Sequence, residues 1–168
     1  MPNLYEVFDR LKATRREYFV VADAVRQVRE EVQTNQILAP LNTSIRDYDA
    51  AIHQLEPTCL VRLWAEFESA LRSYRLHLVA DPNDNIRAIH LINWAQGVEE
   101  GRKVDAGMRD LVHEVREYRN SLVHERDDLA PAVGIDEARR RLSTYLSKLP
   151  DRWGARPGPA AAEWNMVV

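Results

Sequence analysis

The chain has 168 residues, of which 45% are hydrophobic and 29% charged, and its formal net charge at pH 7 is -3. This length and composition are ordinary for one soluble globular domain with a substantial core. The slightly acidic balance excludes a globally basic nucleic-acid-binding protein, so any contact with a polyanion has to be local.

The N-terminal region predicts one long helix from Leu4 to about Gln33. Hydrophobic residues recur there with a spacing of seven along two seams. The first seam holds Leu4, Leu11, Tyr18, Val25 and Val32, and the second holds Val7, Thr14, Val21 and Val28. A helix of this length needs a partner along its whole length. That partner is either the later helices of the same chain or a second copy.

Five further helical segments follow in the sequence. Thr43 or Ser44 is a suitable N-cap for a short helix that ends near Leu55, and Pro57 predicts a break. The strongest apolar stripe runs from Cys59 to Val79, and a less regular helix is expected from Asp84 to Val98. Later helices are expected to begin at Asp105 and Asp136.

No segment alternates between apolar and polar residues as a strand would, so we predict an all-α bundle of five or six helices. Residues 1–150 are expected to form this helical domain. Residues 151–168, which are rich in Pro, Gly and Ala, are expected to form a flexible tail.

Composition also limits the chemistry and the compartment. Cys59 is the only cysteine, so an intramolecular disulfide and a cysteine-based zinc site are both excluded. The N-terminal residues show no signal-peptide pattern, and no apolar run approaches the ~20 residues that span a bilayer. We therefore expect a cytoplasmic protein without a membrane segment.

One stretch, residues 108–128, carries the most informative chemistry. It begins as an amphipathic helix and contains the run Arg119-Asn120-Ser121-Leu122-Val123-His124, called here the motif segment. A second polar line joins His113, Glu117, Asn120 and His124 at helical spacing. Other familiar sites are missing, because there is no glycine-rich phosphate loop, no nucleophile elbow and no His-His pair in His113–Glu117. We predict neither a bound cofactor nor a metal.

The motif segment resembles the signature of the HEPN superfamily, an Arg followed four to six residues later by His, with a polar residue, often Asn, directly after the Arg. The resemblance is sharp over these six residues and loose over the helical body. Two other pairs, Arg46–His53 and Arg72–His77, have similar spacing but lack the Asn. The resemblance implies a small all-α fold, usually dimeric, and in many members a metal-independent ribonuclease. It therefore predicts an endoribonuclease of the toxin-antitoxin or phage-defence type.

The chemistry that this resemblance implies assigns a role to each residue. His124 would transfer protons near neutral pH, Arg119 would bind the phosphate, and Asn120 would orient the imidazole or the phosphate. Because one chain supplies one such His, a homodimer would supply both the base and the acid. Arg119 and His124 point about 140° apart on a continuous helix, so they converge only if the helix ends near Val123 or the site spans two subunits.

The sequence leaves the partners and two alternative functions open. The expected partners are RNA and a second copy, with an antitoxin or inhibitor protein also possible. The Tyr that is nucleotidylated in some HEPN toxins is replaced here by Arg126, which argues against that mode of silencing. The first alternative is a non-catalytic helical module that binds RNA, a nucleotide or a protein. The second is an unrelated helical dimerisation protein that depends on Val25 and Val28. In the plainest interpretation, Arg119 is a surface residue and His124 stabilises a helix dipole.

Overall fold

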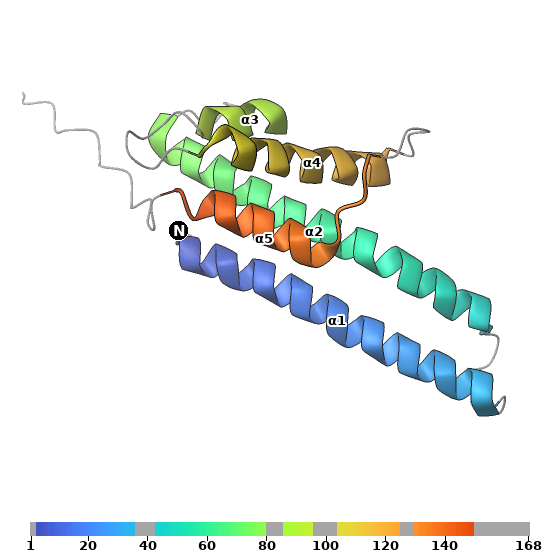
Figure 1. The fold of residues 1–168 in the computed structure, drawn as a ribbon. Coiled ribbons are helices and arrows are strands. Elements are labelled where there is room, and N and C mark those ends of the chain that lie inside the picture. The colour runs from blue at the N-terminus through green and yellow to red at the C-terminus, as the bar shows by residue number, and fades with distance from the viewer. Residues whose placement is uncertain (1–2, 36–42, 80–85, 96–103, 125–129, 150–168) are drawn as a thin grey trace, which may run out of the picture.

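The computed structural model describes residues 3–35, 43–79, 86–95, 104–124 and 130–149. These ranges contain five helices and no strand, which confirms the all-α prediction. The helices are α1 (Leu4–Asn35), α2 (Ile45–Val79), α3 (Ala88–Ala95), α4 (Ala106–Val123) and α5 (Ile135–Leu146). Figure 1 shows α1 and α2 as two long neighbours, with α3, α4 and α5 gathered along one part of α2. The tail predicted for residues 151–168 lies outside the described residues, and within them no helix is both long and apolar enough to cross a membrane.

Helices α1 and α2 form an antiparallel pair. Arg10 pairs with Glu66 at 2.6 Å near one end, and Arg29 pairs with Asp49 at 2.6 Å near the other. The first predicted seam of α1 is therefore used within the chain, and its buried members are Leu4, Leu11, Tyr18 and Val32. The second seam divides, because Val7 and Thr14 are buried whereas Val21 and Val28 are exposed.

The predicted break at Pro57 is wrong, because α2 continues through this residue from Ile45 to Val79. A proline lacks the N–H that would bond the carbonyl four residues earlier, here that of His53. The His53 side chain is exposed, so that side of the helix faces solvent. The Thr58 hydroxyl also donates to the Gln54 carbonyl at 2.7 Å. Packing of α2 along α1 on both sides of Pro57 outweighs the local preference for a break.

The core surrounds the second half of α2. Its fully buried side chains there include Trp64 and Phe67, and they meet buried residues from every other helix. The rings of Phe67 and Tyr145 pack edge to face with centroids 5.6 Å apart. The buried Tyr145 hydroxyl donates to the Ile92 carbonyl at 2.5 Å and so joins α5 to α3. Each large apolar side chain buried in this way contributes about 1.5–3 kcal/mol of transfer free energy.

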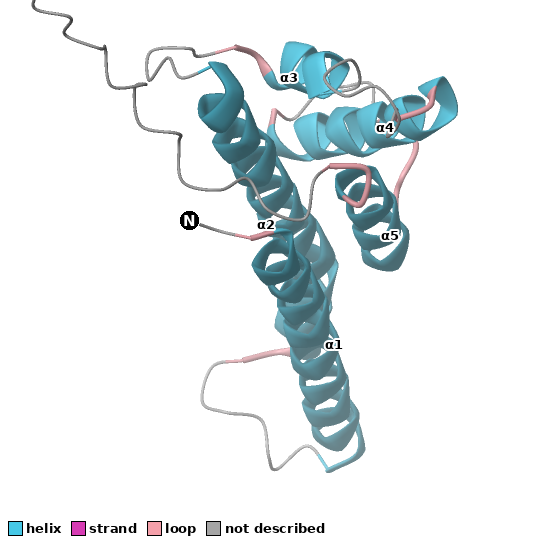
Figure 2. Ribbon diagram, turned by 90° about the vertical axis from the view of Figure 1, so that its left-hand side faces the viewer, coloured by secondary structure: helices cyan, strands magenta, loops and turns pink. Residues whose placement is uncertain are grey.

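Helices α1 and α2 extend beyond the other three helices as a two-helix projection (Figures 1 and 2). Two contacts mark its base, where Arg15 pairs with Asp136 and the Glu56 carboxylate accepts the Ile135 N–H. We call residues 17–35 of α1 and 45–55 of α2 the arm. In the described residues the arm consists of these two helices, so helix packing covers its apolar residues only where the two face each other.

Candidate functional site

Helix α4 carries the motif segment and is fixed at both ends. Asp105 is its N-cap, as predicted, and its carboxylate accepts the Met108 N–H at 2.8 Å. Val112 and Val115 are buried on its inner face. The helix ends at Val123, the position required for the predicted site. His124 is the C-cap, and its backbone N–H donates to the Asn120 carbonyl at 3.1 Å.

Arg119 and Asn120 are joined through their side chains. Arg119 Nη1 donates to Asn120 Oδ1 at 3.0 Å, and both side chains are half-buried. The Nε atom of Arg119 is buried without a hydrogen-bond partner. Among the described residues, no carboxylate pairs with this guanidinium. Within these residues, its positive charge is therefore held in place by a neutral amide and not by a carboxylate.

The other two arginines of α4 are bonded differently. Arg109 pairs with Asp110 at 2.8 Å, and Arg116 pairs with Glu117, so each guanidinium contacts the carboxylate of the next residue. Arg119 follows the same local pattern, but the next residue is Asn120. An amide accepts a hydrogen bond as a carboxylate does, and it leaves the cation free to attract an anion. Because Asn and not Asp or Glu follows Arg119, the group that holds this guanidinium carries no negative charge.

His124 is exposed and stands one turn beyond Asn120. Its only hydrogen bond among the described residues is the backbone bond to Asn120. In the described part of the chain the imidazole therefore makes no hydrogen bond with the guanidinium of Arg119 or the amide of Asn120. The exposed Val123 lies beside it, so this end of α4 presents both a polar and an apolar side chain to solvent.

His113, from the second polar line, has a different environment from His124. Its Nε2 lies 3.0 Å from Asn93 Oδ1 on α3, and its Nδ1 is buried without a partner. Because the amide oxygen can only accept, Nε2 carries the proton. Burial lowers the pKa of His113, and the nearby Arg116 and Arg109 lower it further. The neutral imidazole thus links α4 to α3, which is a structural role.

Two acidic residues of α2, Glu66 and Glu68, are bonded to groups outside the motif segment. Glu66 pairs with Arg10, and Glu68 accepts from the indole of Trp64 at 2.9 Å and from Arg72 at 2.6 Å. The Glu66 carboxylate therefore joins α1 to α2, and the Glu68 carboxylate makes contacts within α2. The pair Arg72–His77 is also unsuited to catalysis, because Arg72 is bound to this carboxylate.

Sequence reasoning missed Glu56, which lies on α2 near Tyr118 of α4. Its Oε1 accepts the Ile135 N–H at 2.8 Å and so caps α5, whose N-cap Gly134 has no side chain to do so. Burial raises the pKa of the Tyr118 hydroxyl, and the charge of Glu56 raises it further. Glu56 thus fixes α5 close to the motif helix. No local pattern could reveal this contact, because it joins residues 79 positions apart.

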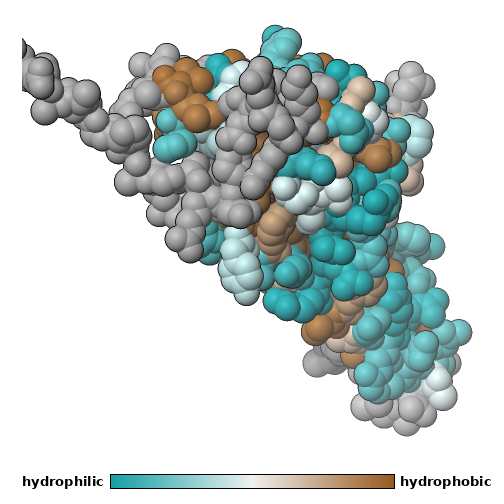
Figure 3. All heavy atoms as spheres, turned by 60° about the vertical axis from the view of Figure 1, so that its left-hand side comes forward, coloured by the Kyte–Doolittle hydropathy of each residue, from teal (hydrophilic) through white to brown (hydrophobic). Residues whose placement is uncertain are grey.

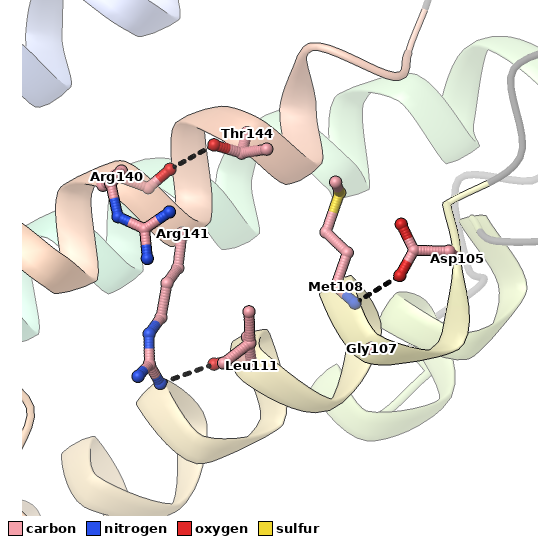
Figure 4. Close-up of a pocket in the computed structure, with 7 residues that line it drawn as sticks. All are labelled: Asp105, Gly107, Met108, Leu111, Arg140, Arg141 and Thr144. Atoms are coloured by element: carbon pink, nitrogen blue, oxygen red, sulfur yellow. Dashed lines mark hydrogen bonds between the residues drawn. The ribbon is translucent and has the colours of Figure 1, made fainter.

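A hollow of about 530 Å³ lies at the opposite end of α4, between its first turns and α5 (Figure 4). It contains no residue of the motif segment. Its two arginines, Arg140 and Arg141, both bond Glu137 and lower the pKa of that carboxyl to about 2. Because these cations are already paired, the hollow is a poor site for an anion. Its lining is Asp105, Gly107, Met108, Leu111, Arg140, Arg141 and Thr144.

Metal chemistry has no visible site in the described part of the chain, where no three His, Cys, Asp or Glu side chains gather closely enough to hold an ion. Comparison with known proteins gave no matching family model, no matching curated protein and no matching solved structure. The relationship to the HEPN superfamily accordingly stays a prediction that rests on the residues Arg119 to His124.

Proposed function

We propose that the protein is a metal-independent endoribonuclease of HEPN type, acting in the cytoplasm as a toxin-antitoxin or phage-defence effector. The observation that carries the proposal is the Arg119–Asn120 pair, in which a half-buried guanidinium is oriented by an amide, one turn before an exposed histidine. A guanidinium that pairs with no carboxylate of the described residues suits a phosphate, because it offers paired charged donors.

The proposed reaction is a transesterification followed by release of the RNA fragment. The ribose 2′-oxygen attacks the adjacent phosphorus and loses its proton to one imidazole. The bond from phosphorus to the 5′-oxygen breaks, and that oxygen takes a proton from a second imidazole. Arg119 stabilises the charge that develops on the phosphoryl oxygens. The products are a 2′,3′-cyclic phosphate and a free 5′-hydroxyl.

Two imidazoles require two copies of the chain. Within the described residues His124 makes no hydrogen bond to the Arg119 side chain, and a two-fold arrangement of α4 helices would bring a second His124 to each guanidinium. The exposed Val123 beside His124 gives such an arrangement an apolar contact at the same face. We therefore include the homodimer in the proposal.

The test is RNA cleavage in EDTA by the purified protein, on single-stranded RNA and on tRNA. We expect the wild type to leave 2′,3′-cyclic ends, which mass spectrometry would identify. His124→Ala and Arg119→Ala should each lower the rate about a hundredfold or more. A suitable control is His53→Ala, which removes an exposed histidine that also follows an arginine, Arg46, and should leave the rate unchanged.

The second candidate is a non-catalytic module that binds RNA, a nucleotide or a protein. It is favoured because, among the described residues, the His124 imidazole makes no hydrogen bond to the side chain of Arg119 or of Asn120. It predicts RNA binding that depends on Arg119 without turnover. A folded wild type that cuts none of these RNAs would support this candidate, and full activity of His124→Ala would exclude the proposed mechanism.

A further inference from the structure

The arm exposes a continuous apolar strip on α1 that none of the other helices covers. Val20, Val21 and Val28 are 69%, 43% and 38% exposed, which is unusual for valines in a folded chain. Figure 3 shows hydrophobic atoms interrupting the mostly hydrophilic surface of this projecting part. Exposed residues at helical spacing extend the strip in both directions. We call it the valine strip, and it consists of Glu17, Val20, Val21, Ala24, Gln27, Val28 and Glu31.

Apart from Glu17, which pairs with Arg62 of α2, the strip lies beside the surface that joins α1 to α2 and not within it. Tyr18, Ala22 and Val32 fill that joint and are buried. Arg29 closes its edge by pairing with Asp49. Positions three and four apart on a helix share one face, so the strip forms a band beside this joint. The geometry is the one that a third helix would need in order to pack against α1.

The strip and the arm both carry a net negative charge. Glu17 and Glu31 stand at the two ends of the strip, and it contains no Lys or Arg. Two of the three arginines in the arm are bound within it, because Arg26 pairs with Asp23 and Arg29 with Asp49. The two ends are fourteen positions apart, or about 21 Å along the axis. A partner would therefore need an apolar face with cations at a similar separation.

This pattern disfavours a second copy of the same strip. If two strips paired antiparallel around Ala24, Glu17 would lie opposite Glu31 of the other copy. A parallel pairing would place each glutamate opposite itself. Both arrangements bring like charges together next to an apolar contact, which destabilises helix pairs. The same carboxylates repel the phosphates of RNA.

We propose that the valine strip binds a basic amphipathic helix of a partner protein. Apolar side chains of that helix would cover Val21, Ala24 and Val28, and its Lys or Arg side chains would pair with Glu17 and Glu31. Glu17 already pairs with Arg62 at 2.7 Å, but both side chains are more than half exposed. Such a pair is worth little and exchanges readily. The inference goes beyond the proposed ribonuclease activity and does not depend on it.

The test uses the full chain and two synthetic helical peptides of three heptads, each with leucine at the inward positions. The basic peptide has lysine at the two flanking positions fourteen residues apart, and the acidic peptide has glutamate there. Binding is followed by fluorescence anisotropy at low salt. We expect the basic peptide to bind at least roughly tenfold more tightly than the acidic one.

Two variants and two matched controls locate the contact. Val28→Lys should weaken the basic peptide about tenfold. Glu31→Lys should weaken the basic peptide and strengthen the acidic one. Glu30→Lys makes the same charge change one residue away, off the strip, and Leu76→Lys replaces an exposed leucine outside the arm. Both controls should bind the basic peptide much as the wild type does.

Several results would overturn the proposal. One is failure of the basic peptide to bind the folded chain, and another is equal binding of both peptides. Loss of a dimer in Val28→Lys, measured by analytical ultracentrifugation, would show that a second copy occupies the strip instead. Crosslinking of RNA to residues of the strip would show a nucleic-acid surface.

Discussion

The guanidinium of Arg119 is held by the amide oxygen of Asn120, 3.0 Å away, whereas the two other arginines of its helix are held by carboxylates. The difference between an amide and a carboxylate at this position is one full charge. It determines whether the guanidinium can attract an anion strongly. The first prediction follows from this pair.

Asn120→Asp should lower RNA cleavage at least tenfold, because a carboxylate would keep the hydrogen bond and cancel the charge of Arg119. The substitution preserves size, so circular dichroism should show an unchanged fold. Glu117→Gln is the matched control, since it replaces a carboxylate by an amide in an exposed side chain of the same helix, the reverse of Asn120→Asp. An Asn120→Asp variant that cuts at the wild-type rate would remove the phosphate-binding role of Arg119.

Glu56→Ala should lower the free energy of unfolding by about 1 kcal/mol, because α5 then loses the acceptor for its first N–H. Gly134→Ser in the same chain should restore most of the loss by supplying a local cap. There is room for the new side chain, since a Cβ at Gly134 would lie in ordinary contact with the Glu56 carboxylate. Urea unfolding of the single and double variants measures both effects. If Gly134→Ser gave no recovery, the role of Glu56 would not be capping.

Acidification should destabilise the fold through His113. Burial lowers the folded-state pKa of His113, so the unfolded chain takes up its proton first as the pH falls. The stabilising contribution is therefore complete above the ordinary histidine pKa of about 6.5 and is lost as the pH falls below it. Urea unfolding at several pH values should show a smaller acid loss in His113→Gln than in the wild type. Parallel curves for the two proteins would contradict this assignment.

Pro57→Ala should raise the free energy of unfolding. An alanine restores the N–H that the His53 carbonyl lacks, and a proline inside a helix costs up to about 3 kcal/mol relative to alanine. Thermal unfolding measures the gain. Ala51→Gly, an exposed change in the same helix, should move the midpoint in the opposite direction. A lower midpoint in Pro57→Ala would mean that the proline shapes α2 in a way that the rest of the fold requires.

Local chemistry allowed several features of the fold to be predicted from the sequence. The cap at Asp105 and the end of α2 at Val79 were predictable because the deciding residues are neighbours in the chain. The break at Pro57 was predicted wrongly, because packing along α1 lies outside any local rule. In the second α1 seam, Val7 and Thr14 are buried and Val21 and Val28 are exposed. The spacing of seven does not distinguish these positions, because it carries no information on where α5 packs.

The candidate site was predictable to a similar depth. The end of α4 at Val123 meets one of the two conditions under which Arg119 and His124 were expected to converge. Asn120 was expected to orient an imidazole or a phosphate, but its oxygen holds Arg119 in the single chain. Glu56 was not foreseen, because its partner Ile135 is distant in the sequence. Catalysis and the homodimer stay predictions.

The continuity of α2 through Pro57 gives one helix two different environments. From Cys59 to Tyr74 it is surrounded by the core, whereas its first turns touch mainly α1. Local opening of the arm therefore breaks fewer apolar contacts than global unfolding does. In native-state hydrogen exchange, amides of the arm should exchange faster than those of the second half of the same helix. The chain would then open in stages, with the arm as its least stable unit.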